Sequence, residues 1–183
     1  MKKRQLSIKE YQTSKDAYTI TIYNARYQKK FANSLKIIFK YFFADEELFF
    51  GFYRTDGVNL SVAQQKRLEK EIPALFLKYG NIQVLNEYLA VARIKVTESV
   101  CDFVPAIFDY YFETTLFNSK VSWEVFKQHF FNYQAHRLDE MILNDFTDMM
   151  FCYFDSGDFS LRFDLNVYKP KKVRGVLEQL FFN

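Results

Sequence analysis

The sequence is poor in the residues that break or cross-link a chain. Its 183 residues include only 5 glycines, 3 prolines and 2 cysteines. Cys101 and Cys152 are too few for a disulfide scaffold and lack the paired spacing of a structural zinc site. We therefore expect a reduced, cytoplasmic setting, and we exclude a disordered or collagen-like chain.

Long apolar runs are also missing. No run of 18 apolar residues occurs, and the start MKKRQLSIKEYQ is basic but lacks the apolar segment of a secretory signal. The sequence therefore predicts a protein that is neither secreted nor membrane-spanning.

Aromatic residues, in contrast, are abundant. The chain has 22 Phe and 13 Tyr, and aromatics make up 20% of its residues. A chain of this length and apolar content can bury a substantial core. We expect residues 1–183 to form a single compact domain.

Alternating side chains predict a β-hairpin at about residues 5–24. In AYTITIYN, Tyr18, Ile20 and Ile22 share one face, and QLSIKEY alternates in the same way. The polar link QTSKD is typical of a hairpin loop.

Apolar residues at three- and four-residue steps predict helices further along. One runs from about Ala25 to Phe43 and carries lysines on another side. Ser61 opens a Ser-x-x-Gln capping box whose helix should end near Gly80, with Pro73 kinking or splitting it. The segment DEELFFGFY between these helices is compatible with either strand or helix.

The second half of the chain continues the mixture of helices and strands. IQVLNEYLAVARIKV suggests one bent strand or two, and Thr97 begins a predicted helix that continues to Phe117. Ser122 caps the longest predicted helix, which ends near Phe146. DMMFCYFDSGDFSLRFDLNVY predicts a hairpin, and KPKKVRGVLEQLFFN predicts a basic segment that ends as a short helix. The predicted fold class is α+β.

The histidines are the only catalytic candidates. His129 and His136 lie seven residues apart on one predicted helix, and two imidazoles can act as general base and general acid in RNA cleavage. The alternative is a half-buried helix face with two ordinary histidines.

No motif indicates a cofactor, and no metal site is predicted. His136 and Glu140 have a metal-binding spacing but no third ligand. The pair Asp145 and Asp148 could hold Mg²⁺, but is explained more simply as a polar helix end. The pair Asp155 and Asp158 could also hold Mg²⁺, but these residues are explained more simply by the residue preferences of a hairpin turn.

Charge is unevenly distributed along the chain. The net charge is +3, but residues 1–40 contribute +8 from ten basic and two acidic side chains, so the remainder carries −5. A basic segment gains affinity for a polyanion by displacing phosphate counterions. The alternative is a solvated basic segment without a partner.

Tyrosines lie among these cations and can stack on bases while the cations hold phosphates. The candidate nucleic-acid-binding residues are Lys2, Lys3, Arg4, Lys9, Tyr11, Lys15, Tyr23, Arg26, Lys29 and Lys30.

The segments QLSIKEYQTSKDAYTITIYN and ARYQKK, which together cover residues 5–30, support a resemblance to a known family. The chain is similar to type II anti-CRISPR proteins of phages and other mobile elements, of the kind whose N-terminal hairpin is implicated in guide-RNA truncation. The resemblance implies an inhibitor that binds Cas9 and its guide RNA in the cytoplasm of a bacterial host cell. It leaves open whether the chain itself has Cas9-dependent ribonuclease activity.

Two other functions remain open. One is a protein-binding inhibitor or immunity protein that uses a patch of Asp45, Glu46, Glu47 and Phe49. The other is a DNA-binding accessory factor of a mobile element, because counterion release does not distinguish between polyanions.

Overall fold

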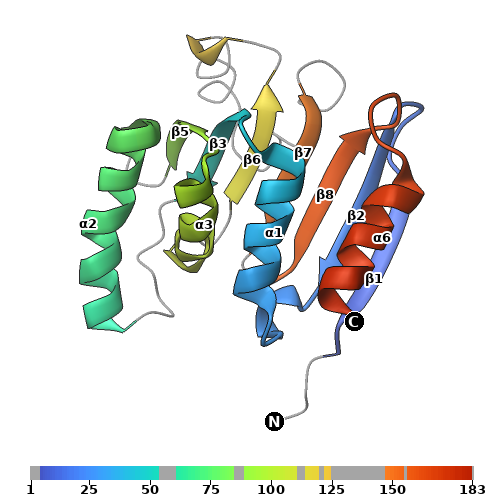
Figure 1. Ribbon diagram of the computed structural model, residues 1–183, viewed down its shortest axis with the longest axis horizontal. Helices are drawn as coiled ribbons and strands as arrows, with labels where there is room; N and C mark the ends of the chain where they lie inside the picture. The colour runs from blue at the N-terminus through green and yellow to red at the C-terminus, as the bar shows by residue number, and fades with distance from the viewer. Residues whose placement is uncertain are drawn as a thin grey trace.

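The strands of the described residues form one eight-stranded sheet, and α1, α2, α3 and α6 cover one of its faces (Figure 1). This computed structural model describes residues 5–53, 61–84, 89–110, 114–119, 122–124, 147–154 and 156–182. The strands are β1 (Ser7–Gln12), β2 (Ala17–Tyr23), β3 (Glu47–Tyr53), β4 (Gly80–Val84), β5 (Leu89–Lys95), β6 (Thr114–Ser119), β7 (Thr147–Tyr153) and β8 (Phe159–Asp164). The helices are the 3₁₀ turn η1 (Ala25–Tyr27), α1 (Phe31–Phe43), α2 (Val62–Tyr79), α3 (Glu98–Tyr110) and α6 (Pro170–Phe181). The fold class is α+β, as the sequence predicts.

The strand order is β1-β2-β8-β7-β6-β3-β5-β4, and every neighbouring pair is antiparallel. Figure 1 shows α2, α3, α1 and α6 side by side in front of the strands. We call the sheet surface against these helices the helix face, and the opposite surface the second face. Because successive strand residues point to opposite surfaces, each strand divides its side chains between the two.

Aromatic side chains fill the core between the sheet and the helices. Phe151 of β7 is fully buried, and its ring lies 5.5 Å from Phe39 of α1, 5.2 Å from Phe108 of α3 and 5.2 Å from Phe159 of β8, measured between centroids. Much of the aromatic content therefore serves packing.

Several local predictions are confirmed. The hairpins β1–β2 and β7–β8 form where alternation places them. Ser61 and Gln64 complete the capping box of α2, and Thr97 accepts from the Val100 backbone N–H at 3.3 Å at the start of α3. The helix α2 ends at Gly80 as predicted, but it continues through Pro73 as one helix, so the predicted split at this proline does not occur.

Two ambiguous segments become strands, and one prediction is wrong. DEELFFGFY contributes β3, and IQVLNEYLAVARIKV contributes two strands, β4 and β5. The helix predicted to continue to Phe117 ends at Tyr110, and Thr114 begins β6. This strand pairs with both β3 and β7, so sheet pairing on two sides overrides the local helical spacing.

The helix predicted from about Ala25 begins later. Residues 25–27 form η1, and the regular helix α1 starts only at Phe31. The reason is that Asn24 adopts a left-handed conformation at φ 60° and Gln28 is extended, which separates the two segments. None of the helices in the described ranges is both long enough and apolar enough to cross a bilayer.

Candidate nucleic-acid interface

The β1–β2 hairpin sorts its charges between the two faces of the sheet. Glu10 lies opposite Ile20 on the helix face, whereas Lys9 and Tyr11 lie opposite Thr21 and Thr19 on the second face. Lys9 is exposed, and 45% of Tyr11 remains accessible. On the second face, β1 therefore exposes Lys9 and Tyr11, whereas Thr19 and Thr21 of β2 are buried, and neither strand contributes a carboxylate there.

The charge of Glu10 is compensated by an ion pair on the helix side. Its carboxylate accepts a hydrogen bond from the Arg174 guanidinium of α6, and Arg174 Nε also donates to Glu178 at 2.8 Å. Partial burial raises the pKa of Tyr18, and the neighbouring Glu10 carboxylate raises it further. The phenol stays protonated, and the charge of Glu10 is compensated away from the second face.

Buried hydroxyl groups lie on the second face of both β2 and β8. Thr21 Oγ1 and Ser160 Oγ form a buried hydrogen bond of 2.7 Å. Thr19 lies between Tyr11 and Arg162 in the register of the three strands. Arg162 of β8 thus lies on the same face of the sheet as Lys9, two strands away, with its Nε buried.

One end of the hairpin is anchored to the β7–β8 turn. The backbone N–H of Asn24 donates to Asp158 at 2.6 Å, and Ser156 Oγ donates to the other Asp158 oxygen at 2.8 Å. Arg26 N–H donates to the Gly157 carbonyl at 3.0 Å. Asp158 therefore serves turn structure, in agreement with the simpler interpretation of its motif, while Asp155 lies outside the described residues.

The basic residues of the hairpin region lie at both ends of the β1–β2 hairpin and at its centre. Arg26, Lys29 and Lys30, which we call the turn cluster, follow β2 beside the β7–β8 turn, and both lysines are exposed. Lys15 lies in the loop at the opposite end, and Lys9 lies between them. At about 3.3 Å per residue, the seven residues of β2 separate the two ends by about 20 Å.

The lysines of α1 do not join this surface. Lys36 pairs with Asp102 at 3.0 Å and Lys40 pairs with Glu98 at 3.2 Å, so α3 compensates the basic side of α1. Sequence periodicity places these lysines on one side of a helix but does not identify the acidic helix beside it.

Two other residues considered in the sequence, Phe49 and Cys101, are buried. Phe49 is buried and its ring contacts Trp123 at 5.4 Å, so it cannot belong to the exposed patch proposed with Asp45, Glu46 and Glu47. Burial raises the pKa of the Cys101 thiol, as expected for an inert core cysteine.

Some candidates lie outside the described residues, namely Lys2, Lys3, Arg4, His129 and His136. Within the described ranges, no three His, Cys, Asp or Glu side chains gather as metal ligands would.

Comparison of the chain with family models, curated proteins and solved structures found no match.

Proposed function

We propose that this protein binds single-stranded RNA on the second face of its β1–β2 hairpin. The observation that carries the proposal is the separation of charge in β1, which places Lys9 and Tyr11 together and directs Glu10 to Arg174. Lysines hold phosphates without reading sequence, and a half-exposed tyrosine can stack on a base. Stacking requires an unpaired base, so this surface suits a single strand better than a duplex.

The resemblance of residues 5–30 to hairpin-bearing anti-CRISPR proteins supports a more specific target. In this proposal the RNA is the guide held by Cas9, the setting is the bacterial cytoplasm, and inhibition follows from loss of part of the guide. The hairpin carries no histidine, and its strand carboxylate is paired with Arg174. The hairpin therefore acts as the RNA-binding part, and any cleaving groups come from elsewhere.

A salt titration with two neighbouring variants tests RNA binding. Lys9→Gln removes a cation from the second face, and Glu10→Gln changes the next residue on the helix face. We expect Lys9→Gln to weaken binding of a labelled single-stranded RNA and to reduce the slope of log K against log salt by about 0.7. Glu10→Gln should change affinity less than about twofold. Absence of wild-type RNA binding at low salt would refute the proposal.

A denaturing gel tests the specific target. Guide RNA is incubated with the protein, with and without Cas9, in Mg²⁺ and in EDTA. A shortened guide that appears only with Cas9 is the expected result. Inhibition of Cas9 with an intact guide and no RNA affinity would instead favour a protein-binding inhibitor.

A further inference from the structure

A second basic cluster lies at the loop end of the hairpin, where α6 begins. The backbone N–H of Leu165 donates to the Asp16 carbonyl at 2.8 Å, which fixes the segment before α6 against the β1–β2 loop. Lys15 belongs to that loop, and the start of α6 supplies three further exposed cations. We call this set the loop cluster; its members are Lys15, Lys169, Lys171 and Lys172.

The lysines of the loop cluster differ from Arg174 on the same helix. Arg174 is compensated by Glu10 and Glu178, whereas no ion pair involves Lys169, Lys171 or Lys172 in the part of the chain that the structure describes. Asp16 and Asp164 also lie at this end, and Asp164 accepts a hydrogen bond from the Asn166 backbone N–H at 2.7 Å. The start of α6 therefore places exposed positive charge beside the loop that carries Lys15.

We propose that the loop cluster is a second phosphate-binding zone for the same RNA strand, which runs from the turn cluster over Lys9 and Tyr11 and then passes around the β1–β2 loop to reach the start of α6 on the helix side. This inference rests on the proposed function and adds to it the length of RNA that the protein contacts. The hairpin separates the two clusters by about 20 Å, which corresponds to roughly six nucleotides of a stacked strand at about 3.4 Å per nucleotide, and to fewer nucleotides of an extended strand. Affinity should therefore rise steeply as an oligonucleotide becomes long enough to reach both clusters.

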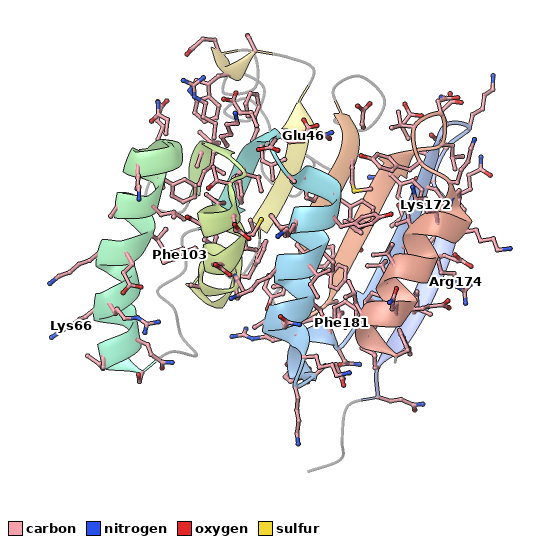
Figure 2. The ribbon with its side chains drawn as sticks, viewed as in Figure 1. Glu46, Lys66, Phe103, Lys172, Arg174 and Phe181 are labelled. Carbon is pink, nitrogen blue, oxygen red and sulfur yellow. The ribbon has the colours of Figure 1, made fainter. Side chains whose placement is uncertain are left out.

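The variant Lys171→Gln with Lys172→Gln removes two cations of the loop cluster. Its matched control, Lys66→Gln with Lys70→Gln, removes two exposed cations from α2. Figure 2 shows Lys66 and Lys172 at opposite sides of the helix layer. Binding of labelled oligouridylates of three to twelve nucleotides is measured for both variants and the wild type, across a salt series.

We expect the α6 variant to lose roughly tenfold in affinity for the twelve-nucleotide RNA and about 1.4 in salt slope, because two phosphate contacts disappear. The increase in affinity with length should also flatten in this variant, while the α2 variant matches the wild type. Equal loss in both variants, or no loss in the α6 variant, would overturn the second zone. In the latter case Lys9→Gln would still test the hairpin face separately, and a wild type that binds no RNA would refute both proposals.

Discussion

Arg174 on α6 donates a hydrogen bond to Glu10 on β1 and joins two segments 164 residues apart in the sequence. The pair has two consequences for the hairpin. It ties the edge strand to the helix layer, and it keeps the carboxylate of β1 away from the surface that carries Lys9 and Tyr11. Strand alternation thus turns the adjacent residues Lys9 and Glu10 into parts of different surfaces.

Replacement of Tyr11 by alanine should weaken RNA binding. A stacked base contributes about 1–3 kcal/mol, so the expected loss is roughly 5- to 150-fold, and Tyr11→Phe should retain the affinity. Tyr41 on α1 is a matched control, because it is 51% exposed against 45% for Tyr11 but lies on the helix layer. An equal loss on Tyr41→Ala in the same anisotropy assay would show that tyrosine exposure, and not its position on the hairpin, determines the effect.

Replacement of Phe151 by alanine should destabilise the fold strongly. The side chain is fully buried among Phe39, Phe108 and Phe159, so truncation leaves a cavity that costs about 3–5 kcal/mol. Phe154, just beyond the same strand, is 37% exposed and its alanine variant should lose less than Phe151→Ala. Urea denaturation measures both free energies of unfolding, and similar values would contradict the assigned core.

Two glycine-to-alanine variants should have opposite effects. Gly157 has φ +83°, and a Cβ there would lie 2.9 Å from Arg26 Cβ, so Gly157→Ala should cost about 1–3 kcal/mol. Gly175 lies within α6, where an added Cβ meets no atom within 4 Å. Because alanine favours a helix, Gly175→Ala should stabilise by about 0.5–1 kcal/mol. Thermal or urea denaturation compares the two, and destabilisation by both would refute the open environment of Gly175.

The buried Cys101 thiol should resist alkaline ionisation. Burial is the main cause that raises the pKa of the Cys101 thiol, and the neighbouring Asp102 carboxylate raises this pKa further. The folded pKa thus exceeds the unfolded one, so this contribution to stability is complete below about pH 8.5 and declines as pH rises toward the folded pKa. In a Cys152→Ser background, a thiol reagent at pH 8 should react with Cys101 much faster after unfolding.

The control for the pH effect is Cys101→Ala in the same background. Its free energy of unfolding should depend less on pH above about pH 8.5, because the thiol is gone. Identical pH profiles for the two variants, together with rapid labelling of the folded protein, would contradict a buried Cys101.

Local signals in the sequence predicted the hairpins and the starts of α2 and α3, but not the start of α1 or the contacts between elements. Alternation in β1 and β2 and the Ser61 capping box depend on neighbouring residues, so they could be recognised directly. The pairing of Lys36 with Asp102 depends on how α1 and α3 pack, which periodicity does not specify. The same limit explains the missed strand β6, whose conformation is determined by strands distant in the sequence.

The placement of β8 against β2 has a consequence for synthesis on the ribosome. Thr21 and Ser160 form a hydrogen bond although they are 139 residues apart, so the β1–β2 hairpin emerges long before its sheet partner is translated. An isolated hairpin is only marginally stable in water. During translation, we therefore expect the basic hairpin to stay largely unstructured at first. It reaches its final geometry when β8 leaves the exit tunnel and can pair with β2.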